Sequence, residues 1–239
     1  MKFTALHKAL TTLMLLVVLF SSGQPDSGDI IHKITKSDNS SYEKIAALDT
    51  VTRYYRTTDP CLSARANFEV AEYYYDFSEY DSSIINILEG INLVSADCDS
   101  SMYARALLMY SYNEIDLGEI KHADSLANVA LNYFESHDNK EEQINCLNAL
   151  AICSAYMGSG FEITNALFRR MYHLAEAEGN PLAPARSLLN IGATHGRFNN
   201  VDSAIFYYQQ VKAINSKKPQ NRMSVNYHDG IAGLYSQKG

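Results

Sequence analysis

A unit of about 40 residues recurs along this chain, and the recurrence restricts the chain to repeat architectures. Small residues mark the repeat at Ala71, Ser111, Ala151, Gly192 and Ala232, with spacings of 40, 40, 41 and 40 residues. Seven residues after each small residue lies a turn-forming residue, at Ser78, Gly118, Gly158, Asn199 and Gly239. A unit this short cannot bury its apolar side alone, so consecutive units must stack on one another.

One unit can be interpreted in detail. The spacing i, i+3, i+4, i+7 of one helix face is followed by Leu147, Leu150, Ala151 and Ser154. Glycines within 158–160 interrupt this helix, and a second apolar run extends to Leu174 before residues 179–181, Gly-Asn-Pro, end it. Each unit is therefore predicted to be a helix, a tight turn, a second helix and a loop. The small residue allows the two helices to approach closely.

A family resemblance rests on the best-preserved copy, which contains Leu188, Ile191, Gly192, His195, Ala204 and Tyr208. This order of large, small and aromatic positions resembles the tetratricopeptide repeat (TPR) family, with His195 in place of the usual Tyr. The usual TPR unit has about 34 residues, so these units are a longer form. In other copies the second small position is filled by Ser83, by Ala123, and by either Ile163 or Thr164.

The resemblance spans roughly residues 64–239. It implies an all-α fold, a right-handed α-α superhelix in which helical hairpins form a TPR-like solenoid. An unrelated helical bundle is the alternative. The family motif is degenerate, so it indicates a fold and says little about function.

The N-terminus has the three-part pattern of a secretory signal. Residues 1–8 carry Lys2 and Lys8 and no acid, residues 9–20 are apolar, and small residues follow up to Gly23. This apolar run is short for a membrane span, which needs ~20 residues. We therefore expect a signal peptide over 1–23 and an exported protein, periplasmic if its source is Gram-negative. An uncleaved membrane anchor or a buried first helix is the alternative.

The rest of the chain is expected to form one repeat domain with a lead-in. Residues 24–40 are rich in Ser, Asp, Gly and Lys and predict a flexible segment. Residues 41–56 predict an amphipathic helix that caps the first hairpin, at the start of a TPR-like domain over 41–239. Because Gly239 falls on a turn position, we expect the last repeat to be truncated. A genuine terminal cap helix is the alternative.

Equivalent positions on the first helices of the units should form columns on the concave surface of the stack. One column contains Arg65, Arg105 and Arg186, with Asn145 and Asn226 in the remaining units. A guanidinium fork suits carboxylates, and an Asn amide offers a donor and an acceptor, so this column suits an extended peptide or its carboxylate end. Nearby positions extend the predicted peptide-binding groove to Phe68, Tyr75, Leu108, Tyr112, Asn148, Tyr156 and Leu189. The alternatives are ion pairs with Glu69 or Glu72 for the arginines, and packing between hairpins for the tyrosines.

Two of the four cysteines are candidates for a disulfide. Cys61 begins a predicted first helix, and Cys98 lies just past the end of the second helix of the same hairpin. Antiparallel helices bring these two ends together, and an oxidising compartment would allow them to be joined. Two free thiols are the alternative. Cys146 and Cys153 lie seven residues apart on one helix, too far to bridge, and are expected to be small core residues.

Composition and motifs narrow the class of function. A net charge of −7 and the lack of a basic run disfavour nucleic-acid binding. The sequence contains no His-Glu-x-x-His, Gly-x-Ser-x-Gly, phosphate-binding glycine loop or Cys-x-x-Cys, so we expect no enzyme, cofactor or metal site. We expect a non-catalytic protein with a protein or peptide partner, and membrane contact only through the signal or a missing C-terminal part. The alternative, from the resemblance, is the extracytoplasmic sensor part of a longer histidine kinase or transcriptional regulator.

Overall fold

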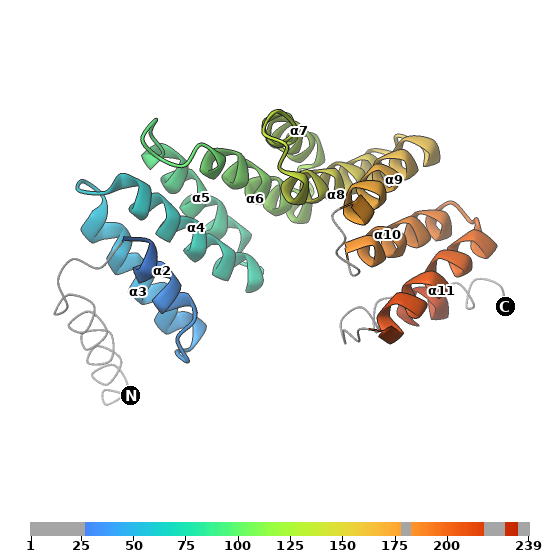
Figure 1. Ribbon diagram of the computed structural model, residues 1–239, viewed down its shortest axis with the longest axis horizontal. Coiled ribbons are helices and arrows are strands. Elements are labelled where there is room, and N and C mark those ends of the chain that lie inside the picture. The colour runs from blue at the N-terminus through green and yellow to red at the C-terminus, as the bar shows by residue number, and fades with distance from the viewer. Residues whose placement is uncertain (1–26, 178–182, 218–227, 234–239) are drawn as a thin grey trace. The chain divides into compact units, whose positions relative to one another are not determined.

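The computed structural model of the chain describes residues 27–177, 183–217 and 228–233, and within them it is helical with short connections and no strand (Figure 1). The first part contains α2 (Ser27–Thr35), α3 (Ser41–Tyr55), α4 (Pro60–Asp76), α5 (Tyr80–Leu93) and α6 (Ser101–Leu117). It is followed by α7 (Ile120–Ser136), α8 (Lys140–Met157), α9 (Phe161–Ala177), α10 (Ala183–Arg197) and α11 (Val201–Lys217). Residues 228–233 are also helical. The predicted signal peptide, Asn226 and Gly239 lie outside the described residues.

The chain divides into two compact units, and the boundary falls inside α6 between Asn113 and Glu114. In the first unit α4 packs against both α3 and α5. In the second unit α8 packs against α7 and α9, and α10 packs against α9 and α11. Each unit is therefore built from helices that contact their neighbours in the sequence, as a repeat protein requires. In the described part of the chain, no helix is both long enough and apolar enough to span a membrane.

The tight turns lie where the repeat predicts them. Ser78, Gly118, Gly158 and Asn199 have φ angles of 60°, 87°, 68° and 59°. A left-handed residue lets the chain reverse after a helix, and glycine adopts this conformation without steric cost. At the first turn the backbone N–H of Glu79 donates to the carbonyl of Tyr74 at 2.9 Å, which satisfies a carbonyl in the last turn of α4.

The predicted small positions are where paired helices approach most closely. Ala71, Ser111 and Ala151 are fully buried. Across the first hairpin the Ser83 hydroxyl donates to the carbonyl of Ala71 at 2.8 Å, so helices α4 and α5 are in contact at this point. Serine at this position provides a hydrogen bond that alanine would not. The small residues thus set the separation of the helices.

The structure decides between two candidates for the second small position of the third hairpin. Thr164 is fully buried, and its hydroxyl lies 2.9 Å from the Ser154 hydroxyl on the paired helix α8. Ile163 is 56% exposed. The equivalent residue is therefore Thr164, because only this side chain faces the partner helix.

Aromatic rings lie directly on three glycines, Gly90, Gly192 and Gly230. A Cβ on Gly192 would lie 2.9 Å from a ring carbon of Tyr208, and a Cβ on Gly90 would overlap the ring of Phe68. His195, which replaces the usual Tyr, is buried, and its ring packs as an aromatic ring would. Its ring stacks on Tyr207 with a centroid distance of 5.2 Å.

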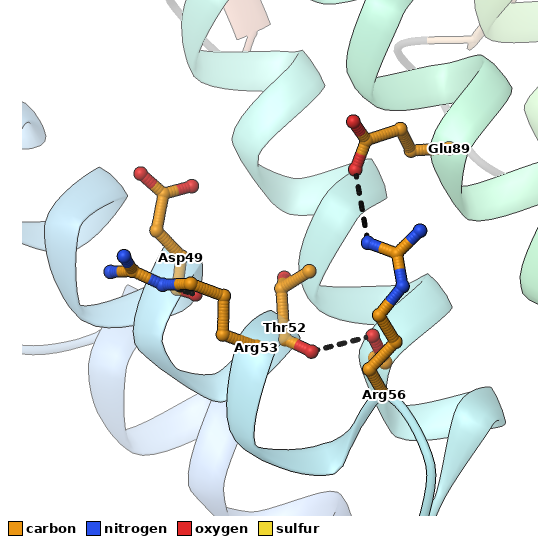
Figure 2. A network of polar contacts seen from close by, with 6 residues as sticks. Asp49, Thr52, Arg53, Arg56 and Glu89 are labelled. Carbon is orange, nitrogen blue, oxygen red and sulfur yellow. Dashed lines mark hydrogen bonds and ion pairs between the residues drawn. The ribbon is translucent and has the colours of Figure 1, made fainter.

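Helix α3 caps the first hairpin, as predicted. Ile45, Leu48 and Val51 are buried on its inner side. The Ser63 hydroxyl on α4 donates to the carbonyl of Thr52 at 2.9 Å. Figure 2 shows that Arg56, which follows α3, reaches Glu89 on α5, with a nitrogen–oxygen distance of 3.7 Å. Helix α3 is therefore connected to both helices of the hairpin.

Helix α2 contradicts part of the expected flexible lead-in over 24–40. Ser27–Thr35 is helical, and Ile30, Ile31 and Ile34 are buried against α3 and α4. These three side chains lie on one side of the helix, and burying each of them contributes about 1.5–3 kcal/mol. Their burial outweighs the polar composition of the segment, which is why the prediction is wrong here.

We expect Gly90→Ala to destabilise the protein although alanine is the better helix former. The new Cβ would overlap the Phe68 ring, and displacing that ring should lower the free energy of unfolding by about 1–3 kcal/mol. The measurement is urea unfolding followed by circular dichroism. Gly233→Ala is the control, because a Cβ there meets nothing within 4 Å and should be neutral or stabilise by up to about 1 kcal/mol. Equal stabilisation by both substitutions would contradict the close contact.

Candidate functional site

The first unit contains a cleft of about 510 Å³ between α4 and α6, which we call cleft A. Its lining consists of Arg65, Phe68, Glu69, Glu72, Asp99, Met102, Arg105, Ala106 and Met109. The residues from α4 follow the spacing of one helix face, and so do those from α6. Two adjacent helices therefore present facing stripes that mix charged and apolar side chains.

Two of the arginines predicted from the repeat meet in cleft A. Arg65 comes from α4 and Arg105 from α6, and both side chains are exposed to solvent. Between these helices, Asp99 provides a shared negative charge. The backbone N–H of Ser101 donates to Asp99 Oδ1 at 2.8 Å, and this bond, with smaller contributions from the two arginines, lowers the pKa of Asp99. Asp99 thus stays ionised beside both guanidinium groups.

Several carboxyl groups lie close together along α4. Burial raises the pKa of Glu69, although Arg65 partly offsets this effect. The pKa of Glu72 is raised from 4.5 to about 7, first by burial of its carboxyl between the walls of cleft A and then by the charges of Glu69 and Asp76. By its accessible surface Glu72 is nevertheless an exposed residue, so the charges of Glu69 and Asp76 matter alongside the partial burial of its carboxyl. Near neutral pH cleft A therefore holds one carboxyl that gains or loses its proton easily.

A disulfide lies beside cleft A. Cys61 in the first turn of α4 is bonded to Cys98 in the connection before α6, with a Cα–Cα distance of 5.3 Å. This confirms the pairing predicted from the hairpin. The other two cysteines, Cys146 and Cys153, are buried free thiols, and burial raises the pKa of each to about 12. They are core residues, as expected.

The second unit contains a separate cleft of about 320 Å³, which we call cleft B. It is lined by Ile152, Ala155, Tyr156, Phe168, Asn190, Ala193, Thr194 and Arg197. The Arg197 guanidinium lies over the Tyr156 ring, 5.3 Å from its centroid, in a cation–π contact. Tyr156, a predicted groove residue, is 60% exposed at the edge of this cleft.

Three polar groove candidates of the second unit, Asn145, Asn148 and Arg186, form hydrogen bonds between α8 and α10. Arg186 Nη2 donates to Asn145 Oδ1 at 3.2 Å. Asn190 Nδ2 donates to Asn148 Oδ1 at 2.7 Å, and Asn148 is buried. In this unit the Arg and Asn column therefore forms one cross-helix hydrogen bond, and the Asn190–Asn148 pair beside it forms a second. Asn148, predicted as a groove residue, is instead buried with its amide oxygen bonded to α10.

The remaining predicted groove residues line neither cleft. Leu108 is buried in the core, since the side of α6 that carries it faces inward, so its assignment to the groove is wrong. Tyr75 packs against Tyr80 at a centroid distance of 5.7 Å, and Leu189 packs in the core cluster around Tyr208. Tyr112 is half-buried outside both clefts.

Sequence reasoning missed Asp99, Met102, Met109 and Arg197. Met102 and Met109 lie three residues before and four residues after Arg105, so helical spacing from the arginine would have identified them. Arg197 lies at helical spacing on α10, eight residues after the predicted Leu189, whereas Asp99 has no such signal because it lies in the connection before α6. No group of three or more His, Cys, Asp or Glu residues suited to a metal ion occurs among the described residues.

No protein-family model and no curated protein matches the sequence. Solved structures are similar in fold. Aspartyl phosphate phosphatase F from Bacillus subtilis aligns with a TM-score of 0.70 and 14% identity over 86% of this chain. The alignment spans 57% of that protein's own length.

Two further structures of similar fold are a TPR-like repeat protein and a gene regulator bound to a peptide. The nearly identical TPR-like repeats of a Podosopora anserina protein align with a TM-score of 0.63 and 12% identity, over 80% of this chain and 93% of that one. The Rap conjugation gene regulator of a plasmid, in complex with a Phr peptide, aligns with a TM-score of 0.63 and 11% identity. That alignment covers 89% of this chain and 69% of the regulator. At such low identity these similarities establish the fold alone.

We expect Glu72→Gln to stabilise the protein at alkaline pH and to have little effect in acid. The raised pKa means that folded Glu72 keeps a proton that the unfolded chain releases above pH 4.5. This contribution to stability is complete below pH 4.5 and is lost as the pH rises through about 7. The Tm of Glu72→Gln should therefore exceed that of the parent at about pH 8 and converge toward it at about pH 5.

Asp38→Asn is the matched control, because Asp38 is exposed between α2 and α3. It removes the same charge away from cleft A. A pH-independent difference between Glu72→Gln and the parent would show that Glu72 is not crowded as described.

Proposed function

Because the chain has the all-α fold of TPR-like solenoids, we propose that it is an exported, non-catalytic protein that binds a peptide segment of its partner through cleft A. The observation that carries this proposal is the meeting of Arg65 and Arg105 in one cleft with apolar walls. Repeat arrays of this kind present an extended surface on which each hairpin contributes a few contacts.

The charged lining suits a carboxylate-bearing ligand. Each guanidinium can donate two parallel hydrogen bonds to a carboxylate, and such charge-assisted bonds are stronger than neutral ones. Asp99 stays ionised next to both arginines and holds their charge in the cleft while no ligand is bound. A ligand carboxylate would replace part of the negative charge that Asp99 provides to the two arginines.

The apolar lining suits the side chains of the same ligand. Phe68, Met102 and Met109 line the cleft between the charged residues. Methionine adapts its shape to different side chains and is common at surfaces that bind varied peptides. Cleft A, at about 510 Å³, has the size of a small-ligand site and would accommodate a short peptide segment.

Cleft B is the second contact region in this proposal. Its polar groups are Asn190, Thr194 and Arg197, beside the exposed ring of Tyr156. Exposed tyrosine is a frequent interface residue because it is large, amphipathic and has few rotamers. The Arg186–Asn145 and Asn190–Asn148 pairs hold the backbone of this surface in place and leave ligand contacts to its edge.

The similar Rap regulator supports peptide binding, since it was solved in complex with a peptide. It also motivates a second candidate role, the extracytoplasmic sensor part of a longer signalling protein, because that structure belongs to a gene regulator. Reading the codons that follow Gly239 separates the two roles. A stop codon favours a free-standing adaptor, and an open frame that encodes a further helix and an apolar span of ~20 residues favours the sensor.

We expect the double variant Arg65→Glu and Arg105→Glu to lose peptide binding while it stays folded, with a modest fall in Tm because the new carboxylates lie near Glu69 and Asp99. A library of short synthetic peptides with free carboxyl ends is first screened on the chain from residue 24 onward, and the best binders are titrated by fluorescence anisotropy. Loss of one or two charged hydrogen bonds, each about 1.5–3 kcal/mol, should weaken binding by about 10- to 100-fold or more. Both side chains are exposed, so the chain should still fold.

The matched control is Lys121→Glu with Lys212→Glu, which reverses two exposed charges that are not part of the cleft A lining. This variant has the same net charge as the arginine variant and should bind like the parent. Equal binding by all three proteins would show that Arg65 and Arg105 are ordinary surface charges. Equal loss in both variants would show attraction by net charge alone.

A further inference from the structure

The Cys61–Cys98 disulfide joins the two helices that form cleft A. Cys61 lies in the first turn of α4, one turn before Arg65. Cys98 lies in the connection that leads from α5 into α6, which carries Arg105. The covalent bond therefore links the element of one arginine to the element of the other.

The disulfide and cleft A also share a wall. Ala64, Cys98 and Met102 form a small buried cluster, against which Cys61, Phe68, Leu93 and Val94 pack. Phe68 and Met102 belong to this cluster and to the lining of cleft A. Movement of the cysteines would thus move two apolar residues of the cleft.

Cys98 further organises the connection that positions Asp99. The backbone N–H of Ser95 donates to Cys98 Sγ at 3.3 Å, and the N–H of Cys98 donates to the carbonyl of Ser95 at 3.1 Å. The next residue, Asp99, caps the start of α6 by accepting from the N–H of Ser101 at 2.8 Å. The bond to Cys61 therefore fixes the residue that carries the shared negative charge of the cleft.

We infer that Cys61 and Cys98 are positioning residues of cleft A, so that peptide binding there requires the oxidised chain. This inference rests on the proposed function, whose site it regulates. Reduction by a dithiol transfers two electrons and two protons to the disulfide. It leaves two cysteine thiols here and a disulfide on the reductant. Residues 94–100 are then no longer cross-linked to α4.

A second buried cluster holds the first hairpin farther along its helices, and Phe68 packs against both this cluster and the one at the disulfide. Ala71, Ile87 and Ala106 form this second cluster, which joins α4, α5 and α6. Reduction should therefore loosen the connection that carries Asp99 and the start of α6, which carries Met102, while the helices stay folded. The geometry between Arg65 and Arg105 relaxes, and the ligand loses the fixed pair of guanidinium groups.

The Cys61–Cys98 bond is the one disulfide that a reductant can break, because the other two cysteines are free thiols. The sequence has four cysteines, and the remaining two, Cys146 and Cys153, are buried free thiols in α8. The pKa of each is raised to about 12, which keeps them as unreactive thiols at neutral pH. A change in binding after reduction can thus be assigned to Cys61 and Cys98.

The test compares three forms of the same chain with a peptide selected on the oxidised protein. The first form is oxidised, the second is reduced by dithiothreitol, and the third is reduced and then bridged through a single methylene between the two sulfurs. We expect the reduced form to bind at least about tenfold more weakly, a loss of about 1.4 kcal/mol, and the bridged form to recover binding. Hydrogen exchange should increase over residues 94–105 on reduction and stay unchanged in α8 and α9.

Each outcome bears on the inference. A reduced chain that binds as tightly as the oxidised one overturns it, and so does a bridged chain that binds as weakly as the reduced one. Faster hydrogen exchange throughout α8 and α9 would show general unfolding and would also overturn it. If the oxidised chain selects no peptide from the library, the proposed function fails instead. The variant Cys61→Ala with Cys98→Ala should match the reduced form and no longer respond to dithiothreitol.

Discussion

The close approach of paired helices at small residues is the constraint on which the rest of the structure depends. Ala71 and Ser83 allow α4 and α5 to meet so closely that a side-chain hydroxyl reaches the opposite backbone. Between α8 and α9 the two side-chain hydroxyls of Ser154 and Thr164 lie 2.9 Å apart. Because a larger side chain would separate the helices, these positions decide where each hairpin presents its outer residues. The clefts follow from that spacing.

The same repeat positions produce different surfaces in the two units. In the first unit Arg65 and Arg105 lie at a cleft whose carboxyls compete for their charge. In the second unit Arg186 and Asn145 hydrogen-bond to each other across two helices. An Asn can both donate and accept, so Arg–Asn and Asn–Asn neighbours pair directly, whereas two arginines cannot hydrogen-bond to each other and have the negative charge of Asp99 beside them. The chemistry of a column therefore depends on which residues become neighbours.

Much of the fold was predictable because it depends on local chain properties. Turn residues at Ser78, Gly118, Gly158 and Asn199 follow from the repeat, and each adopts the left-handed conformation. The Cys61–Cys98 pairing follows from the ends of one hairpin. Composition alone was misleading for α2, where three aligned isoleucines matter more than the polar residues between them. Leu108 and Asn148 were misassigned because equivalence between repeats does not specify which side of a helix is covered.

The sequence by itself determined the all-α repeat plan, the turns, the small contact positions and the cysteine pair, since these depend on helix periodicity and on residues close along the chain. Only the tertiary structure decided which arginines share a cleft, that Asp99 lies between them, and that the carboxyl of Glu72 is crowded. The first two features arise from the distance between α4 and the segment at the start of α6, while the crowding of Glu72 combines burial with charges on its own helix. Packing sets that distance through the summed burial of many side chains, which no single motif encodes.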